Sequence, residues 1–128
     1  RVGVDIEIPT HKTERIQHKF LHESEQRMLE QWKAGSEKQG MENKDVDVHS
    51  HYRLTTLIWS AKEAMFKWWG YGNIDFSEML HVSENNVAAS GELKGLFNNP
   101  NFQTQFPVHY KFFPQIVLAY IFTAPSPK

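Results

Sequence analysis

The chain has 128 residues, enough for one domain with a modest buried core. Its apolar fraction of 40% is typical of a globular protein and excludes a disordered one. Lys plus Arg number 14 and Asp plus Glu number 15, so the charge balance gives no support for nucleic acid as a partner. The absence of cysteine excludes disulfides and Cys-ligated metal sites. No apolar run could span a bilayer and the start does not read as a signal peptide, so we expect a cytoplasmic protein without a membrane partner.

Residues 1–8 (R-V-G-V-D-I-E-I) have the period of two that is typical of a half-buried strand. We expect the apolar side chains of this strand to face the core and Asp5 and Glu7 to point to the opposite face. Pro9 and Thr10 end the strand.

Three helices are predicted next, over residues 12–19, 24–34 and 52–69. Gly35 and Gly70 follow the second and third helices where C-cap glycines belong. The third helix has an apolar stripe at helical spacing, made of Leu54, Leu57, Ile58, Ala61, Met65 and Trp68.

A polar surface loop is expected over residues 35–51. Strands are predicted after the third helix, near residues 79–83, 87–93, 108–113 and 116–123. This order predicts an α+β domain with an antiparallel sheet covered on one side by helices. We expect a single domain over residues 1–123 and a frayed tail over residues 124–128.

Asp5 and Glu7 are the first residues with possible chemistry. Neighbouring carboxylates repel each other and raise each other's pKa. A divalent cation bound between them would relieve this repulsion, and Mg²⁺ is a suitable one because it prefers oxygen ligands. A solvated strand face is the alternative, and these two residues taken alone favour it.

Glu63 and Lys67 share one face of the third helix because they are four residues apart. The alternative is a surface salt bridge worth only tenths of a kcal/mol. With Lys62, this group offers one metal ligand and two cations for phosphate oxygens. Glu25 lies at the start of the second helix, where a capping box is the plain explanation.

Three segments together resemble the 4′-phosphopantetheinyl transferase family. They are Gly3-Val4-Asp5-Ile6-Glu7, Phe20 to Glu25, and Trp59-Ser60-Ala61-Lys62-Glu63 with Lys67. Each segment is a weak signal alone, but the three in this order are specific. The chain looks most like the C-terminal half of the larger, Sfp-like branch, and the smaller holo-acyl-carrier-protein synthase branch is similar in the same motifs.

The resemblance implies a β-α3-β type fold and a Mg²⁺- or Mn²⁺-dependent reaction. In that reaction the phosphopantetheine arm of coenzyme A moves to a serine of an apo acyl or peptidyl carrier protein, and 3′,5′-ADP is released. Carried over by residue, the metal ligands would be Asp5, Glu7 and Glu63. The coenzyme A phosphates would be contacted by Lys62 and Lys67. Glu25 would help to complete the site, and the sequence does not decide whether Glu63 or Glu25 is the base.

Lys12, Arg15 and Lys19 fall at helical spacing and form one basic face. Because the family's carrier proteins are acidic, we expect this face to dock them. A solvated basic stripe is an equally good explanation.

The larger branch carries a His-containing segment upstream of the first motif, and the present sequence opens at Arg1 without it. We therefore expect a piece of a longer enzyme, forming a pseudo-dimer with a missing N-terminal half, or a homo-oligomer. An isolated half should expose an apolar patch. Two other functions are alternatives, a non-catalytic coenzyme A or carrier-binding domain and a metal-dependent phosphohydrolase. Retention of the charged motif residues argues against the first, and the lack of a second metal motif argues against the second.

Overall fold

The computed structural model describes residues 1–39 and 50–124 of the chain, and it contains a five-stranded antiparallel sheet with the strand order β1-β5-β4-β3-β2. The elements are β1 (Val2–Glu7), α1 (Lys12–Arg15), the 3₁₀ turn η1 (Gln17–Lys19), α2 (Glu23–Gln39), α3 (His51–Trp69), β2 (Leu80–Ser83), β3 (Ser90–Asn99), β4 (Phe102–Phe112) and β5 (Val117–Phe122). The predicted α+β fold is confirmed.

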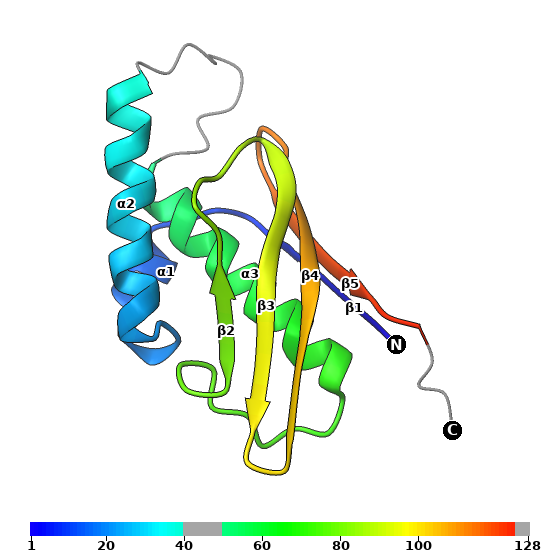
Figure 1. The fold of residues 1–128 in the computed structure, drawn as a ribbon. Coiled ribbons are helices and arrows are strands. Elements are labelled where there is room, and N and C mark those ends of the chain that lie inside the picture. The colour runs from blue at the N-terminus through cyan, green and yellow to red at the C-terminus, as the bar shows by residue number, and fades with distance from the viewer. Residues whose placement is uncertain (40–49, 125–128) are drawn as a thin grey trace.

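Helix α3 lies across one face of the sheet, and the other face is open toward the viewer (Figure 1). All six side chains of its predicted apolar stripe are buried. The helix ends at Gly70, whose φ of 81° is left-handed, as the C-cap prediction required. The strands contribute the other half of the core, which includes Leu80, Val82, Leu93, Phe97, Val108, Val117 and Ile121.

The face of β1 that meets the helix is the reverse of the one predicted. Asp5 is only 4% exposed and faces α3, whereas Val4 and Ile6 are 44% and 58% exposed on the open face. The cause is Gly3: a Cβ atom there would lie 2.0 Å from the carbonyl oxygen of Ala64. Because Gly3 has no side chain, the backbone of α3 can approach β1 closely at this point. Asp5 lies on the same face of β1 as Gly3, so its side chain is also covered by the helix.

Helix α2 continues through Gly35 to Gln39, beyond the predicted end. A glycine inside a helix costs only about 1 kcal/mol, and Glu37, Lys38 and Gln39 after it favour helix. Residues 40–49 of the predicted polar loop lie outside the described residues, and its last residue, His51, already belongs to α3.

The helix predicted over residues 12–19 is in fact two short pieces, α1 and η1. Ile16 between them has φ −107° and ψ 11°, which is not helical. Its basic residues therefore do not share one continuous helical face, which corrects the expected spacing.

Tight turns connect β3 to β4 and β4 to β5, and each pair of strands forms a hairpin. Strands β3 and β4 are longer than predicted and pair from Ser90 with Lys111 to Asn99 with Phe102. The hairpin predicted around residues 113–115 is confirmed, with the amide of Phe113 bonded to the carbonyl of Ile116 at 2.8 Å. No described helix is long and apolar enough to cross a membrane.

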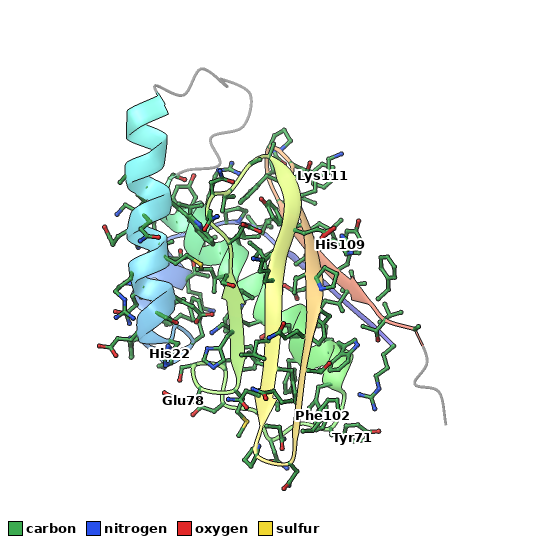
Figure 2. The ribbon with its side chains drawn as sticks, in the orientation of Figure 1. His22, Tyr71, Glu78, Phe102, His109 and Lys111 are labelled. Carbon is green, nitrogen blue, oxygen red and sulfur yellow. The ribbon has the colours of Figure 1, made fainter. Side chains whose placement is uncertain are left out.

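An apolar strip runs along the open face on the two neighbouring strands β1 and β5. It consists of Val2, Val4, Ile6, Leu118, Tyr120 and Phe122. Phe122 and Val2 are 62% and 64% exposed. His109 borders the strip from β4, with its ring stacked on Tyr120 and Phe122 (Figure 2). These side chains form an exposed apolar patch on the described part of the sheet.

Candidate active site

The close packing of β1 on α3 brings four of the predicted site residues together. Asp5 and Glu7 come from the strand, and Glu63 and Lys67 from the helix. Lys67 donates a hydrogen bond from Nζ to Oδ1 of Asp5 at 2.9 Å. Glu7 shares a hydrogen bond with Asp5, and Glu63 is close enough to act on both electrostatically. We call these three carboxylates the acidic cluster.

Burial and the repulsion between neighbouring carboxylates disfavour the charged forms of Glu7 and Glu63. Burial, the hydrogen bond with Asp5 and the charges of Asp5 and Glu63 raise the pKa of Glu7 from 4.5 to about 7. Burial and the charge of Asp5 also raise the pKa of Glu63. The hydrogen bond to Asp5 raises the pKa of Lys67, which therefore stays positive. One ammonium group does not neutralise three carboxylates.

The donor atoms of the acidic cluster suit a hard divalent cation, because all of them are carboxylate oxygens. The single positive charge of Lys67 also leaves negative charge in the cluster that a cation could balance. Within the described part of the chain, no three side chains are already closed around a metal position. Lys67 instead contacts Asp5, the most buried member of the cluster. A bound cation would have to share Asp5 with Lys67 or displace it.

Ser60 also belongs to the site, although the sequence analysis assigns it no role beyond its place in a motif. Its side chain is fully buried, and Oγ donates to Oδ2 of Asp5 at 2.9 Å. Ser60 lies three residues before Glu63, on the face of α3 that meets β1. The three-residue spacing from Glu63 indicates in the sequence that Ser60 lies near the site. It does not identify Asp5 as the partner of Ser60, because the sequence does not show which face of β1 the helix covers.

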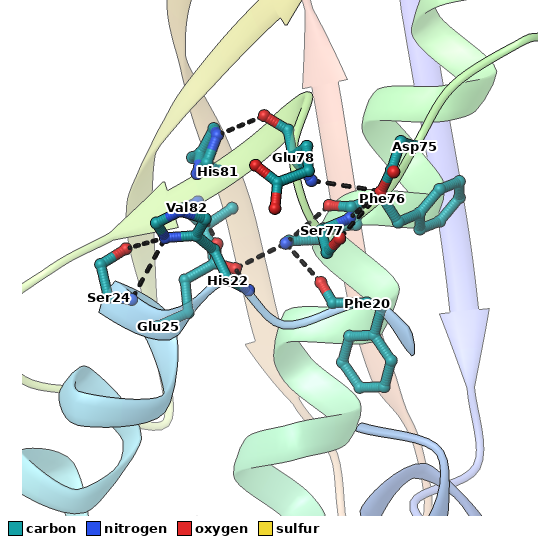
Figure 3. A network of polar contacts seen from close by, with 11 residues as sticks. Phe20, His22, Ser24, Glu25, Asp75, Phe76, Ser77, Glu78, His81 and Val82 are labelled. Atoms are coloured by element: carbon teal, nitrogen blue, oxygen red, sulfur yellow. Dashed lines mark hydrogen bonds and ion pairs between the residues drawn. The ribbon is translucent and has the colours of Figure 1, made fainter. Parts of the chain in front are cut away.

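Lys62 lies apart from the acidic cluster, in the interior. Its Nζ donates to Oε1 of Glu25 at 2.6 Å and to the carbonyl oxygens of Phe20 at 2.6 Å and Phe76 at 2.9 Å (Figure 3). The side chain is 0% exposed, and burial lowers its pKa although Glu25 opposes this. All three ammonium hydrogens are used. The predicted contact of Lys62 with coenzyme A phosphates therefore does not fit its place in the structure.

Glu25 joins three elements instead of facing the acidic cluster. Oε1 accepts from the backbone amide of His22 at 2.9 Å, which is half of the capping box at the start of α2. Oε2 accepts from the amide of Val82 on β2 at 2.7 Å. The carboxylate is 1% exposed and has a partner on each oxygen. Its geometry is that of a structural anchor.

An aromatic cleft adjoins Glu63 and has a volume of about 470 Å³. Its walls include Phe20, Trp59, Phe66 and Phe76, with Lys19 and Asp75 among the polar lining. The rings of Trp59 and Phe66 both lie 5.5 Å from that of Phe76. Glu63 therefore belongs both to the acidic cluster and to the lining of the aromatic cleft. Of the basic residues, Lys12, Arg15 and Lys19 are all exposed, and Lys19 reaches this cleft.

A family model for the 4′-phosphopantetheinyl transferase superfamily matches residues 1–123 of the chain. The chain belongs to this superfamily, whose members transfer phosphopantetheine. No curated protein and no solved structure matched the chain.

The free energy of unfolding of the cation-free protein is expected to fall as the pH rises from about 5 to about 8. The folded-state pKa of Glu7, about 7, lies above the ordinary 4.5. The stability it contributes is therefore complete below the ordinary pKa and is lost as the pH rises through the folded one. The loss should be on the order of 2 kcal/mol. Urea unfolding at several pH values measures it, and Glu7→Gln should flatten the slope. An equal slope in that variant would contradict the assignment.

Proposed function

We propose that the protein transfers the 4′-phosphopantetheine arm of coenzyme A to a serine of an apo carrier protein, releasing 3′,5′-ADP. The observation that carries this proposal is the acidic cluster with Lys67, placed beside an aromatic cleft in a chain of this superfamily. The serine oxygen forms a bond to the phosphorus that bears the pantetheine arm. The bond from that phosphorus to the bridging oxygen of the diphosphate breaks, and the electron pair leaves with 3′,5′-ADP.

Asp5, Glu7 and Glu63 would hold Mg²⁺ or Mn²⁺. When bound, such a cation neutralises charge on the diphosphate oxygens. Lys67 is 50% exposed at the end of a flexible side chain, so its ammonium group can turn from Asp5 to a phosphate oxygen. Positioning and charge stabilisation of this kind carry most of the catalysis in phosphoryl transfer.

Glu63 is the better candidate for the base that takes the serine proton, directly or through water. It lines the cleft, and its raised pKa brings it nearer to the pH at which a base works well. Glu25 has both oxygens engaged and is not among the residues that line the cleft. The aromatic cleft suits the pantetheine arm, whose methyl groups and methylenes gain from apolar contact.

The test is to incubate the protein with coenzyme A, Mg²⁺ and an apo carrier protein, and to measure the carrier by mass spectrometry. A gain equal to the phosphopantetheine arm is expected, and chelation of the cation should abolish it. Binding of coenzyme A without a mass gain on several carriers would instead support a non-catalytic domain. Release of free phosphate would support a hydrolase.

Reversing the charge at Arg15 should weaken carrier docking. Arg15→Glu places a negative charge where an acidic carrier approaches, so the KM for the carrier is expected to rise roughly tenfold. Affinity for coenzyme A should stay the same. Arg27→Glu, on the exposed surface of α2, is the matched control. An equal loss toward both substrates would show that Arg15 does not dock the carrier.

We propose that the apolar strip packs against a second domain of the same fold. When this chain is studied alone, a second copy of it is expected to take the place of that domain. Large apolar side chains on two adjacent strands form a continuous surface of a kind that usually marks an interface. Sedimentation should show concentration-dependent association that Ile6→Lys abolishes. Ser83→Lys, on the polar part of the same open face, should leave it unchanged. A monomeric wild type would contradict the assignment.

A further inference from the structure

The two carboxylate oxygens of Asp5 have different partners. Oδ2 accepts a hydrogen bond from Oγ of Ser60 at 2.9 Å, and Oδ1 accepts one from Nζ of Lys67 at 2.9 Å. Ser60 also lies 3.4 Å from the carbonyl oxygen of Asp5, so it contacts both the side chain and the backbone of the residue. The orientation of the carboxylate is thus fixed from two sides.

The two partners differ in how easily they can be exchanged. Ser60 is 0% exposed on a helix packed directly on β1, and its short side chain cannot move away without the helix. Lys67 has a long side chain that is 50% exposed, and its ammonium can rotate into solvent. Oδ2 is therefore committed to Ser60, while Oδ1 can change its partner.

We propose that Ser60 is a positioning residue, which holds Oδ2 of Asp5 so that Oδ1 is the oxygen offered to a divalent cation. Lys67 is the exchangeable partner of that oxygen and competes with the cation for it. Groups that orient a ligating carboxylate in this way raise metal affinity without touching the metal. The inference rests on the cation site of the proposed function.

The two variants should move cation affinity in opposite directions. Ser60→Ala frees the carboxylate of Asp5 to rotate, and the Kd for Mn²⁺ is expected to rise roughly tenfold or more. Lys67→Met removes a competing positive charge, so in the absence of coenzyme A the Kd for Mn²⁺ should fall several-fold. A purely structural role for Ser60 would predict no such opposition.

The experiment is a titration of the protein with Mn²⁺, without coenzyme A, in which electron paramagnetic resonance reports the free ion. Thr56→Val is the matched control, because it deletes another buried hydroxyl from α3 that bonds Tyr52 and Thr13 but not Asp5. Circular dichroism establishes that each variant is folded. Ser60→Cys, nearly the same shape with a weaker donor, is expected to fall between wild type and Ser60→Ala and serves if the alanine variant does not fold.

An unchanged Kd in folded Ser60→Ala, or an equal change in Thr56→Val, would overturn the proposal. So would a Lys67→Met variant that binds Mn²⁺ no more tightly than wild type. Transfer activity is measured separately on the wild-type protein. If the Kd values shift as expected but no carrier is modified, the role of Ser60 stands and the proposed function fails; activity with an unchanged Kd gives the reverse.

Discussion

Glu63→Gln is expected to reduce phosphopantetheinyl transfer by roughly 10²–10³-fold or more, while the fold stays intact. The amide has almost the shape of the carboxylate but lacks its charge and cannot accept the serine proton. Glu63 is partly exposed beside the cleft and has a raised pKa, so removing its charge should not destabilise the protein. Mass spectrometry of the carrier measures the transfer, and thermal unfolding measures the stability.

The control for this variant is Glu30→Gln, an exposed glutamate on α2 whose pair with Lys33 has a 3.7 Å separation. It makes the same chemical change outside the site and should keep full activity. Wild-type activity in Glu63→Gln would remove both the metal-ligand and the base assignment of this residue.

Lys62→Met is expected to destabilise the protein by about 3–5 kcal/mol. Methionine fills much of the space, but the carboxylate of Glu25 is left buried without its cation. Two backbone carbonyls, those of Phe20 and Phe76, also lose their donor. Urea unfolding measures the change in the free energy of unfolding.

The double variant Lys62→Met with Glu25→Gln should recover part of that loss, because no charge is then buried without a partner. The single amide oxygen of Gln can still accept from one of the two backbone amides, of His22 and Val82, that Glu25 binds. Lys33→Met, which breaks only a surface pair, should change stability by less than about 1 kcal/mol. A loss in Lys62→Met no larger than in Lys33→Met would mean that the buried ion pair contributes little. A loss of transfer without a loss of stability would restore a direct role for Lys62 at the phosphates.

The family, the α+β class and the main helix could all be predicted from the sequence. Helix α3 was predictable because its apolar stripe has helical spacing and Gly70 follows it at the left-handed position. The residues of the acidic cluster were also predictable, since Asp5, Glu7 and Glu63 stand at motif spacings. Each of these features can be recognised from short stretches of the sequence, taken one at a time.

The partners within the site could not be predicted in the same way. The alternation along β1 defines two faces, but it does not tell which face a helix will cover. The more apolar face was the natural choice, and it was wrong, because Gly3 lets the backbone of α3 approach the opposite one. The same close packing put Ser60 against Asp5.

The charged residues, the position of the long helix and the family of the chain all follow from the amino-acid sequence. Tertiary structure decided how those charges are used. Lys62 and Glu25 are 37 residues apart and pair in the interior, while Lys67, five residues beyond Lys62, reaches the acidic cluster. The physical reason is that helix rotation and the closeness of α3 to β1 are set by packing over the whole core, which local spacing does not contain.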